Sequence, residues 1–252
     1  MESIMTLENQ RAVVSGAGSG IGKAIAIEFA KAGAKLVLTD INPATLIASA
    51  ELCKQEGAEV ITVISDISTP TGAIAGVNRC VMEFEGIDIL VNNAGILTQA
   101  PCEDISLKMW DDMINIDLRS VFLASQAAIP HMKKQQHGRI INISSQLGIK
   151  GGAELCHYVA AKAGVIGLTK SLAIECASHG VLVNAIAPGP IETPLVDGIS
   201  SAWKAAKAKE LPLGRFGKAE EIAPTALLLA SSPSGNLFVG QTLGPNSGDV
   251  MP

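Results

Sequence analysis

A strand–turn–helix–strand pattern near the N-terminus constrains the fold of this chain most strongly. Residues 11–15 form a short β-branched run, and the next seven residues carry glycine at positions 16, 18, 20 and 22. An amphipathic segment follows, and a second apolar run, 35–39, ends at Asp40. Glycines between a strand and a helix allow a sharp turn and a close approach to a pyrophosphate. The pattern therefore predicts a nucleotide-binding β-α-β unit.

The same alternation continues along the chain. We expect further strands at 59–64, 87–91, 138–143, 181–187 and 237–243, with helices between them. The helix over 107–134 contains Pro130, which can introduce a kink. Strands that alternate with helices predict an α/β fold, a doubly wound parallel sheet with helices on both faces. Residues 1–252 are expected to form a single domain, in which 191–217 interrupts the alternation and forms a mobile lid.

Composition excludes several function classes. The net charge is −5 and aromatic residues make up only 3% of the chain, so neither charge nor base stacking favours nucleic-acid binding. No apolar run approaches the roughly 18 residues of a membrane span, and residues 1–10 lack the pattern of a secretory signal. Five cysteines without CxxC spacing indicate reduced thiols in a cytoplasmic protein, and no metal site is expected. The lysines between 204 and 209 are expected to form a solvated helix face.

Asp40 bears on the choice of cofactor. A carboxylate at the end of the second strand can accept hydrogen bonds from both hydroxyls of an adenosine ribose, and it repels a 2′-phosphate. No Lys or Arg stands at the next three positions. The sequence therefore favours NAD over NADP. The alternative is that Asp40 only caps the following helix.

Two further strand ends carry polar residues. Asp66 and Ile67 could contact an adenine, although Asp66 is also a common turn residue. Asn92 is expected to tie neighbouring strands together. The residues after it are small and are expected to face the cofactor: Asn93, Ala94 and Gly95.

Tyr158 and Lys162 provide a candidate for proton transfer. Their spacing of four residues puts both side chains on one face of a helix. A phenol titrates near pH 10 in water, and a neighbouring cation lowers its pKa. The pair can move a proton while a cofactor moves a hydride. His157 points to another side of the helix and is expected to pack or to lie at an interface. Cys156 could border the substrate pocket, but it is expected to be a small apolar filler.

Taken together and in order, these motifs resemble the short-chain dehydrogenase/reductase family. The resemblance extends over about residues 11–250 and rests on Gly16xxxGly20xGly22, Asp66, Asn92-Asn93-Ala94-Gly95, Ser145, Tyr158xxxLys162 and Pro188-Gly189. It implies a Rossmann-like sheet of about seven strands, oxidoreduction of an alcohol/carbonyl pair with a nicotinamide cofactor, and a homotetramer. It requires no metal for the chemistry.

The resemblance also assigns roles by position. Tyr158 is the general acid/base, Lys162 lowers its pKa and binds the nicotinamide ribose, and Ser145 holds the substrate oxygen, whereas Ser144 is structural. The implied cofactor contacts are Gly16, Ser19, Gly20, Ile21, Gly22, Asp40, Asp66, Ile67, Asn93, Ala94, Gly95, Tyr158, Lys162, Pro188, Gly189, Ile191 and Thr193.

One position departs from the family's pattern. Asp117 stands where many members carry an asparagine that holds a water in the proton relay to the lysine. Asp117 could instead pair with Lys162 through a water molecule, or Asn115 could serve in part.

The substrate pocket is expected to be mainly apolar. Its predicted contacts are Ser145, Gln146, Leu147, Leu155 and Tyr158, with Ile96 and Leu97 at its edge. A secondary alcohol or ketone fits such a pocket and is the function that we expect. One alternative is a 3-oxoacyl-carrier-protein reductase, although these enzymes usually prefer NADP and dock an acidic carrier on basic residues, where this chain has Gln135, Gln136 and His179. A second alternative is a catalytically silent nucleotide-binding scaffold.

Overall fold

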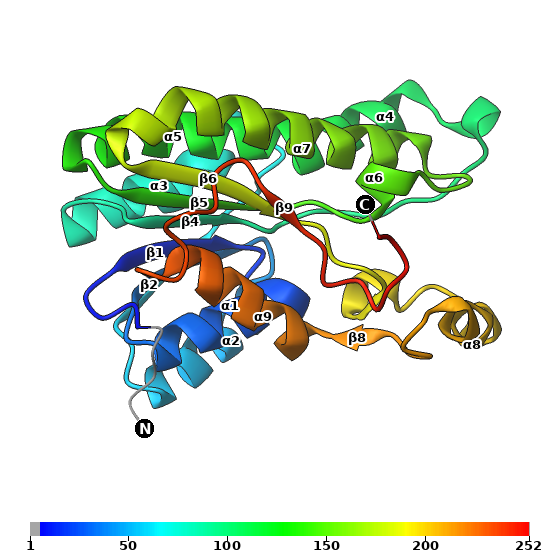
Figure 1. Cartoon of the computed structure of the whole chain (residues 1–252), viewed down its shortest axis with the longest axis horizontal. Helices are drawn as coiled ribbons and strands as arrows, with labels where there is room; N and C mark the ends of the chain where they lie inside the picture. Colours follow the sequence, from blue (N-terminus) through cyan, green and yellow to red (C-terminus); the bar gives the residue numbers. More distant parts are fainter. Residues whose placement is uncertain (1–5, 252) are drawn as a thin grey trace.

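The computed structural model describes residues 6–251, so the first half of the N-terminal stretch that was inspected for a signal lies outside the described residues. A sheet of seven parallel strands forms the middle layer (Figure 1). Its spatial order is β3-β2-β1-β4-β5-β6-β9. The strands are β1 (Arg11–Ser15), β2 (Lys35–Asp40), β3 (Val60–Ile64), β4 (Ile89–Asn92), β5 (Gly138–Ile143), β6 (Val181–Ile186) and β9 (Thr242–Leu243).

Helices cover both faces of this sheet, which confirms the predicted doubly wound α/β architecture. On one face lie α1 (Gly20–Lys31), α2 (Pro43–Gln55) and α9 (Ala219–Ala230). On the other lie α3 (Pro70–Phe84), α4 (Leu107–Ile114), α5 (Ser120–Gln135) and α7 (Cys156–Cys176). Two apolar clusters fill the spaces between the layers, one around Phe29 of α1 and one around Met132 of α5. Burying apolar surface on both faces is what allows consecutive apolar residues such as Val13-Val14 of β1 and Ile140-Ile141 of β5.

Local sequence signals set several helix starts. Asn42 accepts hydrogen bonds from the backbone amides of Ala44 and Thr45 at the start of α2, and Pro43 occupies the first helical position. Thr69 caps α3 in the same way, with Pro70 following it. These polar caps satisfy amides that have no partner within the helix.

The segment between 107 and 135 differs from the prediction of one long helix with a kink at Pro130. The α-helical geometry continues through Pro130, and the irregularity lies earlier, in a π-helical turn, Asn115–Arg119, between α4 and α5. A π-turn inserts one residue into the helix and often occurs at functional sites. In this chain it carries Asp117.

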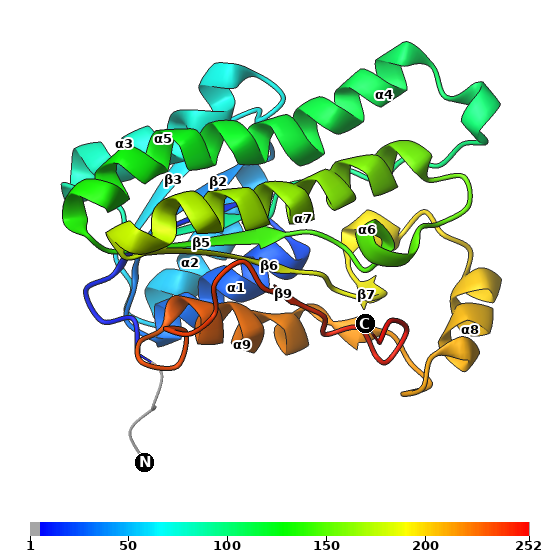
Figure 2. The same ribbon diagram turned by 45° about the horizontal axis from the view of Figure 1, so that its top comes forward.

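The C-terminal part of the chain lies beside the carboxyl ends of the strands (Figure 2). Residues 191–217 contain β7 (Ile191–Glu192) and α8 (Ser201–Glu210), and β7 pairs with β8 (Gly217–Lys218) outside the main sheet. The last strand is shorter than the predicted 237–243 and contains only Thr242 and Leu243, because Gly240 turns with a φ of 66° and Leu237 is exposed. The tail after β9 approaches the short helix α6 (Leu147–Lys150).

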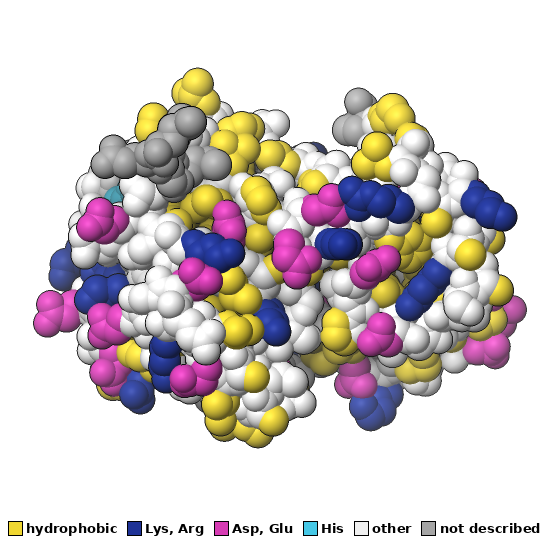
Figure 3. Space-filling model, turned by 90° about the horizontal axis from the view of Figure 1, so that it is seen from below, with side chains coloured by type: hydrophobic (Ala, Val, Ile, Leu, Met, Phe, Trp, Pro, Cys, Tyr) yellow, Lys and Arg dark blue, Asp and Glu magenta, His cyan; other side chains and the backbone are white. Residues whose placement is uncertain are grey.

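The face covered by α1, α2 and α9 carries acidic and basic side chains that are interspersed (Figure 3). No helix within residues 6–251 is both long and apolar enough to span a membrane.

Candidate active site

The candidate site begins where the strand order reverses, between β1 and β4. The Ser15 hydroxyl accepts hydrogen bonds from the backbone amides of Asn93 (3.0 Å) and Ala94 (3.1 Å), and the Asn93 side chain donates to the Ser15 carbonyl (2.9 Å). Asn92 donates to the Asn142 side chain of β5 (2.8 Å), a structural contact of the kind predicted for it. Ligands of open α/β sheets bind at such a switch point.

The glycine-rich turn after β1 leaves no room for side chains. Gly16 has a φ of 64°, and a Cβ on it would lie 2.8 Å from the Cα of Ala94. A Cβ on Gly22 would lie 2.2 Å from the carbonyl oxygen of Gly16. The backbone of the turn therefore packs on itself and on the end of β4. The turn leads directly into α1, so its last backbone amides belong to the N-terminus of that helix.

Asp40 lies against this turn. Its Oδ2 accepts a hydrogen bond from the Gly18 amide (2.9 Å), and its Oδ1 accepts one from the Asn42 amide (2.9 Å). The helix cap of α2 is Asn42, so capping does not account for Asp40. The carboxylate is fixed beside the glycine turn, where a ribose hydroxyl could reach it. The first turn of α2 contains no basic side chain.

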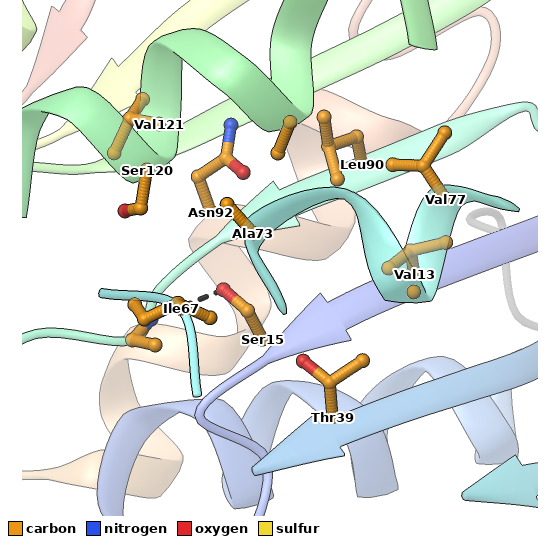
Figure 4. Close-up of a pocket in the computed structure, with 13 residues that line it drawn as sticks. Val13, Ser15, Thr39, Ile67, Ala73, Val77, Leu90, Asn92, Ser120 and Val121 are labelled. Atoms are coloured by element: carbon orange, nitrogen blue, oxygen red, sulfur yellow. Dashed lines mark hydrogen bonds between the residues drawn. The ribbon is translucent and has the colours of Figure 1, made fainter. Parts of the chain in front are cut away.

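Asp66 and Ile67 follow β3 at the same edge of the sheet. The Asp66 carboxylate is exposed and accepts a hydrogen bond from the Ser68 amide (2.9 Å). The Ser68 side chain and this backbone bond together lower the pKa of Asp66. Ile67 lines a small cavity of about 20 Å³ together with Ser15, Thr39 and Asn92 (Figure 4). A cavity of this size can hold about one water molecule, so it is not a substrate pocket.

Residues 188–193 lie next to the glycine turn. The Pro188 carbonyl accepts a hydrogen bond from the Gln146 amide (3.0 Å), and the Gly189 amide donates to the Pro245 carbonyl (3.1 Å). Further along, a Cβ built on Gly20 would lie 3.2 Å from the methyl group of Thr193. The segment that carries Pro188, Gly189, Ile191 and Thr193 is thereby brought to the N-terminus of α1.

The side chains with acid–base chemistry gather at the ends of β5 and α7. Ser144 donates to the Lys162 carbonyl (2.8 Å), which anchors α7 on the end of β5. Ser145 is left beside the phenol of Tyr158, close enough to lower its pKa. The ammonium of Lys162 lies 5.6 Å from the centre of the Tyr158 ring and donates to the Ile143 carbonyl (3.2 Å). The structure therefore brings Ser145, Tyr158 and Lys162 together.

Asp117 joins this group directly. Its Oδ2 forms an ion pair with Lys162 Nζ at 3.0 Å, and its Oδ1 accepts a hydrogen bond from the Ile96 amide (2.9 Å). The Asp117 side chain has no exposed surface. The expectation that Asp117 pairs with Lys162 through a water molecule is therefore wrong, because the π-helical turn brings the carboxylate into contact with the ammonium. Asn115 forms no such contact with Lys162 in the described residues.

Burial dominates the titration of the pair. Desolvation raises the pKa of Tyr158 above its usual value, and the Asp117 carboxylate raises it further, although Lys162 and the neighbouring Ser145 hydroxyl act in the opposite direction. For Lys162, desolvation lowers the pKa, but the charges of Asp117 and Tyr158 outweigh it and the pKa is raised. Lys162 acts on Tyr158 with the predicted sign. Burial and Asp117 nevertheless outweigh Lys162, so that the pKa of Tyr158 is raised overall.

An apolar wall lies beside Tyr158. Leu147, Leu155, Ile96 and Leu97 pack against the cluster that contains Tyr158 and the buried Met113. These side chains come from the loop after β4, from α6 and from the segment before α7. The structure brings together the apolar residues predicted at the pocket. A larger hollow of about 610 Å³ lies further out, between Thr193 and α8, and contains none of the acid–base residues.

Gln146 points away from this wall toward the C-terminal tail. Its amide nitrogen donates to the Asp249 carboxylate, which also binds Lys150 Nζ (2.6 Å) and Lys207 Nζ (3.0 Å). Lys207 was predicted on a solvated face, but its side chain is only 17% exposed because Asp249 holds it. Sequence reasoning missed Asp249, since an acidic residue in a polar tail carries no signal that it will reach α8.

The two neighbours of Tyr158 on α7 behave differently. His157 is fully buried, and its Nε2 hydrogen-bonds to the Thr98 hydroxyl (2.7 Å), so it packs as predicted. Cys156 is exposed, and the prediction of an apolar filler is wrong. Within residues 6–251, no three His, Cys, Asp or Glu side chains are gathered in a way that could hold a metal ion.

Comparisons with known proteins give matches over most of the chain. The model of the family described as short chain dehydrogenase matches residues 10–203. The 3-oxoacyl-[acyl-carrier-protein] reductase FabG of Thermotoga maritima is 38% identical over 247 residues, which cover 98% of this chain and 100% of that protein. A solved short-chain type dehydrogenase/reductase from Mycobacterium marinum superposes with a TM-score of 0.93 at 32% identity, covering 98% of each chain.

A further solved structure was determined with NADP. It is assigned as a 2-deoxy-d-gluconate 3-dehydrogenase from Agrobacterium tumefaciens. It is 34% identical to this chain, with a TM-score of 0.87, and the match covers 96% of this chain and 97% of that one.

Proposed function

The chain belongs to the short-chain dehydrogenase family of oxidoreductases, and from this premise we propose that it transfers a hydride between NAD(H) and a secondary alcohol or ketone. The observation that carries the proposal is the meeting of Ser145, Tyr158 and Lys162 beside an apolar wall. An acid–base group, a hydroxyl for the substrate oxygen and a space for carbon are what this reaction requires.

The residues around the glycine turn fit a dinucleotide. The turn packs so tightly that a Cβ on Gly16 or Gly22 would clash, which leaves its backbone open to a pyrophosphate. Asp40 is held beside the turn by the Gly18 amide and can accept the adenosine-ribose hydroxyls. Gly16, Ser19, Gly20, Ile21 and Gly22 would hold the pyrophosphate end, and Pro188, Gly189, Ile191 and Thr193 the nicotinamide end.

The nicotinamide group supplies the hydride chemistry when it is bound, and the chain supplies proton transfer and orientation. In the direction of oxidation, the Tyr158 phenolate takes the proton of the alcohol, and the Ser145 hydroxyl holds the oxygen. Lys162 stabilises the phenolate, and its second anionic partner is Asp117. The apolar side chains Leu147 and Leu155 exclude water from the reacting carbon.

The preference for NAD is supported by charge. The Asp40 carboxylate would repel the 2′-phosphate of NADP, and the first turn of α2 offers no cation to compensate it. Because a structural relative from Agrobacterium tumefaciens was solved with bound NADP, the preference of this chain for NAD over NADP has to be measured.

A second candidate is the reduction of 3-oxoacyl-carrier-protein thioesters, which the 38% identity to the Thermotoga maritima reductase favours. Gln135 does not add to an acidic-carrier dock, since its amide is used on the Ile87 carbonyl (2.8 Å). We also propose a cytoplasmic homotetramer. Its support is the set of large apolar side chains that the outer helices leave exposed: Leu107, Trp110, Phe122 and Ile174.

The test is a panel of secondary alcohols, polyols, cyclic ketones and a 3-oxoacyl thioester, assayed by reduced-cofactor absorbance with NAD(H) and NADP(H). We expect turnover of an alcohol or ketone with NAD(H). Faster turnover of the thioester with NADPH would favour the second candidate. A catalytically silent scaffold would bind NADH and turn over nothing.

Tyr158→Phe tests the acid–base assignment. We expect turnover to fall by about 10²- to 10⁴-fold, because general acid–base catalysis contributes an effect of that size, while NAD binding measured by calorimetry is retained. Ser145→Ala and Ser144→Ala form a matched pair, since only Ser145 faces the phenol. Near-normal turnover of the Tyr158 variant would refute the mechanism.

A further inference from the structure

Two exposed thiols face one another at the edge of the candidate active site. The Sγ atoms of Cys102 and Cys156 are 3.8 Å apart. Cys102 begins a short 3₁₀ turn, Cys102–Asp104, in the loop after β4, and Cys156 begins α7, two residues before Tyr158. We propose that Cys102 and Cys156 form a reversible disulfide, which makes this pair a redox modification site that controls access to the substrate pocket.

The two segments that carry the thiols are already held together. The Ala100 amide donates to the Glu154 carbonyl (3.0 Å), and the Gln99 side chain donates to the Glu154 carboxylate (2.8 Å). A disulfide requires a sulfur–sulfur distance of about 2 Å, so each thiol must move by only about 1 Å. Both lie at the ends of loops, where such a shift needs no change in the core. The crosslink joins positions 54 residues apart and closes a long loop.

The rest of the chain makes this pair selective. Cys53, Cys80 and Cys176 are buried. Burial raises the pKa of Cys53 to about 11 and that of Cys80 to about 12. The pKa of Cys102 is raised as well, by its contact with Cys156, so exposure rather than acidity distinguishes the pair. The two exposed cysteines are therefore the ones that an oxidant in solution can reach.

The chemistry balances with hydrogen peroxide as oxidant. One thiolate attacks a peroxide oxygen, the O–O bond breaks, and a sulfenic acid and one water form. The second thiol then attacks the sulfenic sulfur, the S–S bond forms, and the hydroxyl leaves as a second water. Two thiols lose two electrons and two protons, and one peroxide becomes two waters. A dithiol reverses the step by exchange.

The position of the crosslink links it to the substrate. Leu155 precedes Cys156, and Ile96 and Leu97 precede Cys102 on the other segment; all three pack around Tyr158. The disulfide would fix the distance between the segment that carries Leu155 and the segment that carries Ile96 and Leu97, and substrate and product must pass between them. The effect on turnover therefore rests on the proposed function, whereas formation of the crosslink does not.

The experiment treats the full-length protein with hydrogen peroxide, blocks remaining thiols, and digests it with trypsin without reduction. We expect peptides 80–108 and 151–162 to be joined, as measured by mass spectrometry, and to separate after dithiothreitol. Cys102→Ser and Cys156→Ser should each abolish the link. Because peptide 80–108 also contains Cys80, a link that persists in Cys102→Ser would overturn the proposal. Dimers on a non-reducing gel in place of the internal link would overturn it as well.

The same samples are assayed for turnover of whichever substrate the panel identifies. We expect oxidation to lower kcat/KM by roughly threefold or more, since motions that admit substrate often limit turnover, and dithiothreitol to restore it. Cys102→Ser should show normal turnover before and after peroxide. A complete crosslink with unchanged kinetics would refute control of access. If no substrate is found, the peptide map still decides whether the disulfide forms, so the two proposals fail separately.

Discussion

Replacing Asp117 with asparagine tests the most unusual contact of the site. The substitution keeps the shape of the side chain and removes its charge. In the native chain the Asp117 carboxylate lies 3.0 Å from Lys162 Nζ, which lies 5.6 Å from the centre of the Tyr158 ring. The carboxylate is therefore within about 9 Å of the ring, and at an effective dielectric constant of about 20 such a pair interacts by about 2 kcal/mol.

The sign of the effect follows from the charges. The Asp117 carboxylate raises the pKa of Tyr158, so its removal favours the phenolate. Oxidation of an alcohol needs the phenolate, and its rate therefore rises as pH passes through the pKa of Tyr158. We expect the midpoint of this rise to move to lower pH by about one pH unit in Asp117→Asn, because one unit corresponds to 1.36 kcal/mol.

The assay is kcat/KM for alcohol oxidation across the pH range, with the enzyme saturated by cofactor. Asp112→Asn is the matched control, since Asp112 lies on the adjacent helix α4 and pairs on the surface with Lys108. Its profile should not move. An unchanged or upward-shifted midpoint for Asp117→Asn, with normal folding, would show that Asp117 does not act on the phenol through Lys162.

The same substitution affects stability. It leaves the Lys162 ammonium buried with only neutral partners, the Ile143 carbonyl and the new amide. An asparagine oxygen retains one acceptor, so we expect a loss of about 1–3 kcal/mol in the free energy of unfolding. Thermal unfolding measures it. A loss without any change in the pH profile would indicate a purely structural role.

Two further predictions concern other buried charges. Asp249→Asn should raise KM more than it lowers kcat, because Asp249 connects α8, through Lys207, to the site. The lysine and glutamine partners of Asp249 outweigh desolvation and lower its pKa, so the stability that it contributes is present at neutral pH and is lost as pH falls through the acid range. Thermal unfolding at pH 7 and below pH 4 checks this loss. Asp88→Asn should lower the free energy of unfolding by about 2 kcal/mol, since two side-chain nitrogens of Arg11 bind it at 2.7 Å; urea unfolding measures the loss, and a value like that of the surface variant Glu83→Gln would contradict it.

The sequence predicts the sheet well because each strand is an apolar run with its own stop. The ends of β1 and β5 coincide with the predicted bounds, and Gly16 and Ser144 mark those ends. The last strand was overestimated, because β-propensity in 237–243 does not reveal that Gly240 turns there. Strands of two residues, such as β7, depend on tertiary pairing and leave almost no local signal.

The candidate site was predictable where its residues lie close together in the sequence. Tyr158 and Lys162 share a helix face, so their spacing alone brings them together. Asp249 and Lys207 lie far apart in sequence, and nothing in either segment indicates their contact. Gln146 illustrates the same limit, since nothing in the sequence indicates that its amide reaches Asp249 in the tail.

Asp117 shows how a small backbone irregularity changes the chemistry at a predicted position. Its alignment with the family's asparagine was readable from the sequence, but the π-helical turn at 115–119 was not, because π-turns have no strong composition. Within that turn the Asp117 carboxylate pairs directly with Lys162, which would then serve two anions, Asp117 and the phenolate formed in the proposed reaction. An ammonium shared in this way stabilises each anion less than one devoted to a single partner. We therefore expect the proton chemistry of this site to depend on Asp117 as well as on the tyrosine and lysine that the motif identifies.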